Sequence, residues 1–302
     1  MVKNLVLENI SVGFKLPQGV FYAVDDVSLS LPGGNFTAII GESGCGKSVL
    51  GQAILNILPS GVIKKGRVLY NGEQVKKILS VFGIIPQNPS ESLNPVRKIG
   101  KQMQDVLAVH QMADSDNSYK KQCLRLFGLQ EAERVLAAYP HELSGGMLQR
   151  VLCAMAVSSK PEWILADEPT KGLDEQVGAV VRKNLLTIKQ DLHLSMLIIT
   201  HDIALAQEVC DDVLVMYAGQ VLEHNADIWH KPLHPYTKGF LQALPKNGLQ
   251  VIPGKAPVPG ESFTGCKFAA RCPYCTTRCK EEKPAMQQVG NAEVRCFLYA
   301  EG

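Results

Sequence analysis

The stretch FTAIIGESGCGKS (residues 36–48) decides the fold of this 302-residue chain. An apolar run typical of a β-strand leads into G-x-x-x-x-G-K-S, whose glycines let backbone N–H groups close around phosphate oxygens without a Cβ in the way. A helix should begin near Lys47, and its N-terminus adds partial positive charge. Strand, loop and helix in this order predict a phosphate-binding loop. The alternative is a glycine-rich turn without a ligand, which the flanking strand and helix disfavour.

The loop residues carry the contacts that a nucleoside triphosphate needs. Lys47 should reach the β- and γ-phosphates, and Ser48 should coordinate Mg²⁺ through its hydroxyl. The other predicted nucleotide-binding positions form the loop itself: Gly41, Ser43, Gly44, Cys45 and Gly46. Cys45 stands where the pattern accepts any residue, so we interpret it as a small filler.

The surrounding sequence alternates between strand and helix patterns. Short β-type runs fill residues 1–40, and helical patterns are richest between about 98 and 160. Strand patterns return in three later segments: EWILA (162–166), SMLIIT (195–200) and DVLVMYAGQVLEH (212–224). This alternation predicts an α/β domain with a largely parallel sheet.

Two adjacent carboxylates end the strand predicted in WILADEPT (163–170). Ligands of open α/β sheets collect at the carboxyl ends of strands. Asp167 is therefore expected to hold Mg²⁺ through water, and Glu168 to orient and polarise the attacking water. The alternative is that both carboxylates cap the next helix, but the phosphate loop upstream favours catalysis.

Charge and hydropathy limit the possible partners. The net charge of +2 gives no electrostatic case for nucleic acid or an acidic membrane. The longest apolar run, VLCAMAV (151–157), is far shorter than the roughly 20 residues of a spanning helix. The start, MVKNLVLENI, lacks the pattern of a secretory signal. We therefore expect a cytosolic protein with reduced thiols.

The segment ELSGGMLQR (142–150) resembles the signature of ABC ATPases, and other elements of that family follow in order over about residues 3–230. The resemblance implies an ABC-type P-loop ATPase, with a RecA-like core, an antiparallel β subdomain and a helical subdomain, that hydrolyses ATP with Mg²⁺. Gln87, in IIPQNP, matches the Q-loop glutamine, which faces Mg²⁺ and the membrane subunit. His201, in IITHD, matches the switch histidine, so the resemblance adds Gln87 and His201 to Glu168 as catalytic residues.

The resemblance also implies further ATP-binding residues. Ser144, Gly145 and Gly146 match the signature, and Asp174, in KGLD, matches the D-loop aspartate. Phe14 matches the aromatic residue that stacks on adenine, with Phe21 and Tyr22 as nearby alternatives.

The signature offers a second phosphate-binding helix start, although the loop at 41–48 already cradles one nucleotide. The family places the two ends on different ATP molecules by pairing two cassettes head to tail. ATP then closes the pair and hydrolysis opens it, which is a ligand-driven shift between two conformations.

Three segments resemble the peptide and nickel importers of the family: SESLNPVRKIGKQM (90–103), HKPLHPYTKGFLQALP (230–245) and GCKFAARCPYCTTRC (265–279). They imply an ATPase subunit that energises uptake of peptides or of nickel and metal chelates, peripheral on the cytoplasmic face of the membrane. The implied partners are a second, related ATPase subunit, two transmembrane permease subunits and, indirectly, an extracytoplasmic substrate-binding protein, with no nucleic acid. The short segment between YNGEQV (70–75) and Gln87 resembles the nickel or metallophore branch.

We expect two domains: a nucleotide-binding domain at 1–235, with a helical subdomain at about 88–160, and a C-terminal extension at 236–302. Five of the nine cysteines lie in the extension. Four of them match the arrangement that holds a [4Fe–4S] cluster in some dipeptide-importer ATPases: Cys266, Cys272, Cys279 and Cys296. Cys275 is an addition to that pattern.

Four thiolates suit either an iron–sulfur cluster or tetrahedral zinc, although zinc sites usually show C-x2-C pairs. Reduced thiols or labile disulfides are the third alternative. The role is expected to be structural, because the tail has few apolar runs with which to build a core of its own.

Other ABC proteins fit the sequence less well. A soluble ATPase of DNA repair would separate its two halves by a long coiled coil, whereas the segment between Lys47 and Ser144 is short and lacks heptads. An ATPase that acts on ribosomes would usually carry two cassettes. An exporter would not explain the tail.

Overall fold

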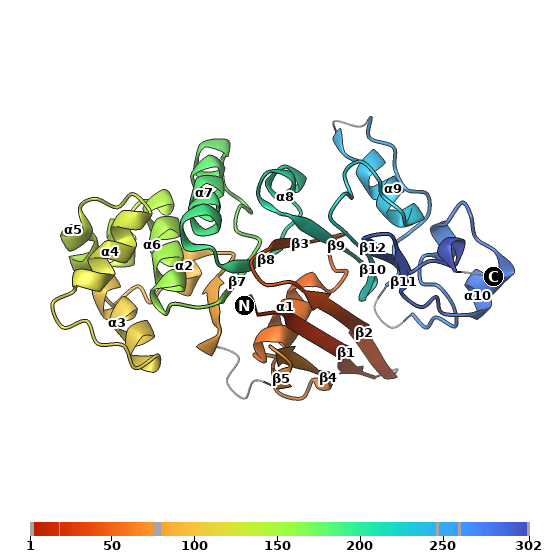
Figure 1. Ribbon diagram of the computed structural model, residues 1–302, viewed down its shortest axis with the longest axis horizontal. Helices are drawn as coiled ribbons and strands as arrows, with labels where there is room; N and C mark the ends of the chain where they lie inside the picture. Colours follow the sequence, from red (N-terminus) through yellow and green to blue (C-terminus); the bar gives the residue numbers. More distant parts are fainter. Residues whose placement is uncertain (1–2, 18, 75–79, 246–247, 259–260, 301–302) are drawn as a thin grey trace.

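The structure, a computed structural model, describes residues 3–17, 19–74, 80–245, 248–258 and 261–300 (Figure 1). The short segment that resembled the nickel branch includes 75–79, which lie outside the described residues. Among the described residues, we find no helix with both the length and the apolar character that a bilayer crossing requires.

A four-stranded antiparallel sheet comes first in the chain. Its strand order is β2 (Gly19–Leu31), β1 (Leu5–Leu16), β4 (Ile63–Tyr70) and β5 (Glu73–Gln74). Strands β1 and β2 are longer than the sequence predicted, because they pair as one hairpin from Leu5 opposite Leu31 to Leu16 opposite Gly19.

The central sheet has eight strands in the order β11, β12, β10, β9, β3, β8, β7, β6. Their bounds are β3 Phe36–Ile40, β6 Phe82–Ile85, β7 Trp163–Asp167, β8 Ser195–Ile199, β9 Asp212–Tyr217, β10 Gln220–Asn225, β11 Gln287–Val289 and β12 Ala292–Val294. The strands from β9 through β3, β8 and β7 to β6 are parallel, as the sequence predicted, and the β10, β12 and β11 side is antiparallel.

The hairpin β9–β10 turns at Ala218 and Gly219, whose φ angles are 47° and 82°. Positive φ at both central residues is typical of a type I′ turn, whose backbone twist matches the twist of the two strands that it joins. The segment 212–224, which reads as one strand-forming stretch, is therefore two strands.

Helices cover both faces of the central sheet (Figure 1). Helix α1 (Lys47–Leu55) and the first sheet lie on one face, and α7 (Glu175–Thr187) and α8 (Ile203–Val209) lie on the other. Beyond β6 and β7, five helices form one end of the molecule: α2 (Pro89–Ser92), α3 (Ile99–Val109), α4 (Ser118–Leu126), α5 (Ala132–Ala137) and α6 (Gly145–Ser158).

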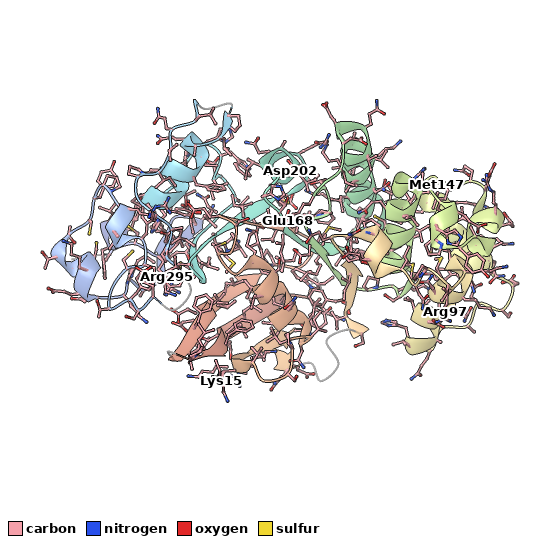
Figure 2. The ribbon with its side chains drawn as sticks, turned by 180° about the vertical axis from the view of Figure 1, so that it is seen from behind. Lys15, Arg97, Met147, Glu168, Asp202 and Arg295 are labelled. Carbon is pink, nitrogen blue, oxygen red and sulfur yellow. The ribbon has the colours of Figure 1, made fainter. Side chains whose placement is uncertain are left out.

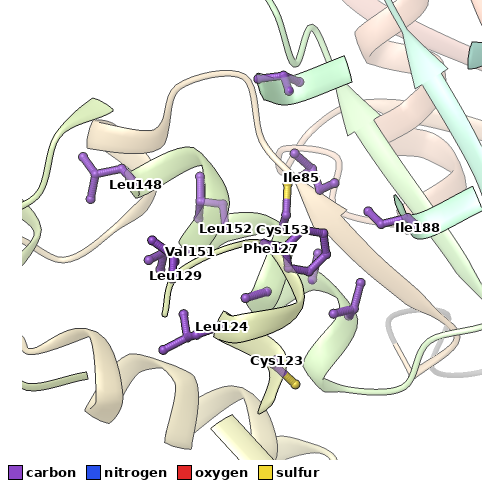
Figure 3. Packing of buried hydrophobic residues seen from close by; sticks show 14 of the residues in the cluster. Ile85, Cys123, Leu124, Phe127, Leu129, Leu148, Val151, Leu152, Cys153 and Ile188 are labelled. Atoms are coloured by element: carbon purple, nitrogen blue, oxygen red, sulfur yellow. The ribbon is translucent and has the colours of Figure 1, made fainter. Parts of the chain in front are cut away.

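The helical end packs through a continuous apolar cluster (Figure 3). Leu148, Val151 and Leu152 of α6 share this cluster with Leu124 of α4 and with Phe127, and all five are buried. The cysteines Cys123 and Cys153 lie buried in the same cluster, so the scattered thiols of this region pack as small apolar side chains.

The C-terminal extension shares the core of the cassette. Strand β12 pairs with β10, where Glu223 faces Val294. The ring of Phe268 lies 5.4 Å from the rings of Tyr217 and Tyr236, which belong to β9 and to α9 (Pro235–Gln242). The short helix α10 (Thr277–Glu281) ends the cysteine-rich segment, which is residues 264–282 and carries four of the five tail cysteines. The predicted boundary at 235 and 236 lies at the start of α9 and stays a prediction.

Candidate active site

The predicted phosphate loop joins the carboxyl end of β3 to the start of α1. Close backbone contacts explain two of its glycines. A Cβ on Gly41 would lie 2.1 Å from the carbonyl oxygen of Met216, and one on Gly46 would lie 2.1 Å from that of Ala23. Both glycines have positive φ, at 147° and 106°. The loop is thus held against β9 and β2 with no room for side chains at these positions.

Lys47 and Ser48 lie where the sequence predicted them, at the first turn of α1. The Lys47 side chain folds back onto the start of the loop. Its Nζ donates to the carbonyl oxygens of Gly41 at 2.9 Å and Glu42 at 3.1 Å. The hydroxyl of Ser48 donates to Oδ1 of Asp167 at 3.1 Å. This bond brings the phosphate loop to the carboxyl end of β7.

Glu168 and His201 come together from neighbouring strands. The Glu168 Oε2 lies 2.6 Å from Nδ1 of His201, and it also accepts from the His201 backbone N–H at 3.3 Å. The Glu168 side chain is mostly buried, whereas His201 is largely exposed. Glu168 has a φ of 49°, a left-handed conformation that costs a non-glycine residue about 1–3 kcal/mol. Its backbone N–H donates to Ile199 of β8 at 2.7 Å, which helps to hold this conformation.

Burial raises the pKa of Asp167 above its ordinary value, and the nearby Glu168 charge acts in the same direction. The hydrogen bond from Ser48 and the charge of Lys47 oppose the rise without cancelling it. A carboxylate in this setting gains from a nearby cation, because the cation favours its charged form.

Asp202, which Figure 2 shows close to Glu168, forms a hydrogen bond with Thr170 that the sequence did not predict. Thr170 Oγ1 donates to Asp202 Oδ2 at 3.2 Å, and Asp202 Oδ1 caps α8 by accepting from Leu205 N at 3.0 Å. The link ties the loop after β7 to the loop after β8. The available signal was the acidic residue directly after His201 in IITHD.

Gln87 lies at the same edge of the sheet as the two acids, whereas the start of the signature lies at the helical end. Gln87 is exposed, two residues beyond β6, at the same carboxyl edge of the sheet as Asp167. Ser144 caps α6, because its Oγ accepts from Met147 N at 3.3 Å. Figure 2 shows Met147 at the helical end of the molecule, well away from Glu168. The start of α6 therefore lies apart from Glu168, whereas Gln149, further along the helix, donates to the carbonyl oxygen of Pro169 at 3.5 Å.

Asp174 likewise caps a helix, since its Oδ1 accepts from Val177 N at 2.9 Å at the start of α7. The signature glycines have a different setting from those of the phosphate loop. A Cβ on Gly145 or Gly146 would meet no atom of the described residues within 4 Å. Packing among these residues thus gives no reason for glycine at the two positions.

A cavity of about 320 Å³ opens beside the phosphate loop. It is lined by Gly44 of the loop, by the alternative aromatics Phe21 and Tyr22, and by Phe263 and Lys267 of the extension. Phe14 lies across the hairpin from Phe21 and packs, half-buried, against the core cluster of the first sheet. The two aromatic alternatives are thus the ones that line this cavity.

Four cysteines of the extension line a second cavity, of about 170 Å³: Cys266, Cys272, Cys279 and Cys296. The additional Cys275 directs its thiol to the carbonyl oxygen of Thr276 at 3.5 Å. All nine cysteines lie in the described part of the chain and are free thiols. Burial raises the pKa of Cys266 to about 11, and the neighbouring thiols add to this rise.

Across the described residues, no three His, Cys, Asp or Glu side chains form a group that could hold a metal ion as they stand. The expected metal sites at Ser48, Gln87 and Asp167 and at the four tail cysteines stay predictions. The four thiols nevertheless share one cavity, and Ser48 and Asp167 share one hydrogen bond.

Two family models match the chain. The model described as "ABC transporter" matches residues 24–171, and the one described as "Oligopeptide/dipeptide transporter, C-terminal region" matches residues 222–279. The oligopeptide transport ATP-binding protein OppD of Haemophilus influenzae is 34% identical over 98% of both chains. The dipeptide transport ATP-binding protein DppD of Escherichia coli is 36% identical over 95% of this chain and 94% of the relative.

Solved structures of ABC proteins have folds similar to that of this chain. CbiO1 of Clostridium perfringens, described as part of the ABC transporter complex cbiONQ, superposes with a TM-score of 0.63 at 26% identity, covering 76% of this chain and 90% of that one. The ATP-binding cassette MJ0796, described as a dimer in a post-hydrolysis state bound to ADP and Pi, has a TM-score of 0.62 at 25% identity, covering 73% and 97%.

Proposed function

The chain belongs to the ABC transporter family, as an ATP-hydrolysing subunit of the peptide importer type, and from this premise we propose how its site works and what it serves. The observation that carries the proposal is the Glu168–His201 contact of 2.6 Å, at the strand ends beside a phosphate loop whose Ser48 is bonded to Asp167. Together these residues supply the parts that phosphoryl transfer to water needs.

We assign the chemical roles as follows. Lys47 and the loop N–H groups hold the triphosphate, and Glu168 orients and polarises the attacking water. His201 holds Glu168 in position and faces the γ-phosphate. Ser48 and Asp167, with Gln87 from the next strand, would hold Mg²⁺, which neutralises charge on the phosphates when bound. The hydrogen bond between Ser48 and Asp167 supports a shared site for this ion.

We propose that the signature serves the ATP of a second cassette. The exposed Ser144 and Gly145 and the open space beside Gly146 support an approach from outside the chain. The start of α6 offers partial positive charge to a phosphate there. Asp174, at the start of α7, is assigned to the same interface. The similar cassette MJ0796 is described as dimeric, which is consistent with this arrangement.

The proposed assembly contains this subunit, a second and related ATPase subunit, two transmembrane permease subunits and, indirectly, an extracytoplasmic binding protein. The subunit would lie peripherally on the cytoplasmic face of the membrane. Because the curated relatives are named for oligopeptides and dipeptides, we propose peptides as the cargo in preference to nickel or metal chelates.

We also propose that Cys266, Cys272, Cys279 and Cys296 hold a [4Fe–4S] cluster in preference to a single zinc ion. Four thiolates are the usual ligands of such a cluster. The shared cavity of about 170 Å³ is several times the roughly 30 Å³ that one water occupies, so it suits a multi-atom group. Binding would draw the four thiols together and would stabilise the tail.

Anaerobically purified protein should contain iron and acid-labile sulfide in a ratio that one cluster per chain explains. Replacing Cys279 by Ser should remove both, whereas Cys275→Ser should retain them. Stoichiometric zinc without iron would reassign the cavity, and protein free of both metals would leave the cysteines as thiols.

The function is tested by affinity purification of the chain from its native membrane. We expect it to bring down two membrane-spanning subunits and a second cassette, and the isolated complex to hydrolyse ATP faster when peptide-loaded binding protein is added. Recovery with ribosomes or with DNA-repair proteins, and without membrane subunits, would contradict the importer assignment.

A further inference from the structure

An arginine of the cysteine-rich segment contacts the phosphate loop directly. Arg271 lies immediately before Cys272, and its side chain is only 8% exposed. Its Nη1 lies 3.1 and 3.2 Å from the two carboxylate oxygens of Glu42, the second residue of the loop. The two residues are 229 positions apart in the chain.

The guanidinium of Arg271 is fixed on several sides. Nε donates to the carbonyl oxygen of Pro253 at 3.1 Å, Nη2 to that of Ile252 at 3.4 Å, and Nη1 to the hydroxyl of Tyr217 at 3.3 Å. The guanidinium also lies over the Tyr217 ring, with its carbon 5.7 Å from the ring centre. A planar cation with several N–H donors suits this position better than a lysine ammonium.

Glu42 connects Arg271 to the other residues of the phosphate loop through its own backbone hydrogen bonds. Its backbone N–H donates to the hydroxyl of Tyr236 at 3.1 Å, so α9 holds the same residue from a second side. Its carbonyl oxygen accepts from Nζ of Lys47 at 3.1 Å. The residue that meets the tail arginine is therefore also bonded to the lysine that we assign to the phosphates.

A second cation of the segment is connected to Cys45 of the phosphate loop through a series of hydrogen bonds. Lys267, next to Cys266, lies 2.8 Å from Oδ2 of Asp25 and donates to the carbonyl oxygen of Ala218 at 2.8 Å. Asp25 N in turn donates to Gly219 O, and Gly219 N donates to Cys45 O, each at 2.9 Å. The chain of contacts thus runs from the cysteine segment through β2 and the β9–β10 turn to the phosphate loop.

We propose that the cysteine-rich segment is part of the nucleotide site, with Arg271 as a positioning residue that sets the phosphate loop through Glu42. This inference rests on the nucleotide role proposed for the loop. Since coupling between two sites is reciprocal, the segment raises the affinity for ATP and bound ATP tightens the segment. A merely structural arginine would stabilise the fold without this two-way effect.

The test uses the full-length chain and measures ATP affinity by calorimetry, together with hydrogen exchange of residues 264–282. Arg271→Ala should weaken ATP binding roughly five- to thirtyfold, and Arg271→Lys should recover only part of the loss. ATP should slow exchange in the segment of the parent. The matched control is Lys280→Ala, which removes an exposed cation of the same segment and should leave both quantities unchanged.

Glu42→Gln approaches the contact from the loop side and leaves the tail sequence intact. It should abolish most of the ATP-dependent slowing in 264–282 even if Arg271→Ala folds poorly. Alanine at both positions should weaken ATP binding no more than one replacement alone, because coupled residues are not additive. Full additivity, or ATP-dependent slowing that survives Glu42→Gln, would overturn the proposal.

Lys47→Ala separates this inference from the function on which it rests. If Lys47→Ala weakens ATP binding while Arg271→Ala and Glu42→Gln bind as the parent does, only the role of the tail fails. If Lys47→Ala binds ATP normally, the nucleotide assignment of the loop fails as well.

Discussion

At the scale of single residues, the site depends on Glu168. Its left-handed backbone and its contact with His201 place one carboxylate oxygen at the edge of the sheet where the phosphate loop begins. Neighbouring Asp167 is bonded to Ser48 instead, so the two adjacent acids have separate partners and separate expected tasks.

Glu168→Gln should reduce ATP hydrolysis by the assembled transporter about a hundredfold or more, because the amide cannot accept the proton of the attacking water. ATP binding should persist and the closed pair of cassettes should accumulate. Phosphate release and nucleotide binding are measured on the same preparation. Turnover equal to that of the parent would remove Glu168 from the catalytic role.

Lys47→Ala should weaken ATP binding by roughly ten- to a hundredfold, the loss expected for one hydrogen bond to a charged group. The comparison is Lys183→Ala, which removes an exposed cation on α7 away from the loop. Titration with a fluorescent ATP analogue measures both variants. Equal affinities would exclude Lys47 from the phosphate site.

The local sequence was enough to predict site residues that belong to one continuous motif. It could not predict contacts between residues that are far apart in the chain and meet only in the folded protein. A strand, a glycine loop and a helix in sequence are enough to place Lys47 and Ser48, and the end of an apolar strand is enough to place Glu168. The Arg271–Glu42 contact has no local pattern, because each residue looks like an ordinary surface charge until the tail folds over the loop.

At the scale of elements, strand β12 is joined to the sheet by a histidine as well as by backbone pairing. His224 of β10 lies 3.2 Å from Asp212 of β9 through Nε2 and 3.3 Å from Glu293 of β12 through Nδ1. The paired strands come from residues some 70 positions apart, and no local pattern in the sequence predicts their pairing.

This histidine should make the attachment of β12 depend on pH. Burial alone would lower the pKa of His224, but the hydrogen bonds and charges of Asp212 and Glu293 outweigh burial, so the pKa lies above 6.5. The contacts of protonated His224 with the two carboxylates therefore stabilise the fold fully below pH 6.5. This stabilisation is lost as the pH rises through the raised pKa of His224. After correction for intrinsic exchange, hydrogen exchange at 292–294 should quicken as the pH rises from 6.5 through the raised pKa of His224.

His224→Gln supplies the matched control, because it retains polar contacts without titrating in this range. The pH dependence at 292–294, after correction for intrinsic exchange, should flatten in the variant. An identical pH dependence in both proteins would exclude His224 as its source.

At the scale of the whole molecule, the phosphate loop lies near the middle and the signature lies at the helical end (Figure 2). This separation is consistent with the proposal that each cassette contributes halves of two different reaction centres. The sequence predicted two phosphate-binding helix starts, and the separation between them became visible only in the fold.

Gly146→Ala should separate folding from assembly. The added Cβ meets no atom of the part of the chain that the structure describes within 4 Å, and it lies in the first turn of α6. The free energy of unfolding should therefore stay equal or rise by up to about 1 kcal/mol. ATP hydrolysis by the assembled transporter should nevertheless fall, because the methyl group would crowd the partner's nucleotide. Urea unfolding and steady-state hydrolysis are compared.

Gly178→Ala on α7 is the matched substitution, since its Cβ would make only an ordinary contact at 3.7 Å with Arg182. It should change stability similarly without loss of hydrolysis. If Gly146→Ala were as active as Gly178→Ala, the signature would not approach a second nucleotide.

The pairing of β12 with β10 also bears on how the protein is made. A chain cut short before residue 292 would leave β10 as the border of the central sheet, with its outer N–H and C=O groups unpaired. Such a border invites strands from other molecules. During translation, β10 therefore stays uncovered until residues 292–294 have been synthesised, and products truncated before them should be prone to aggregate.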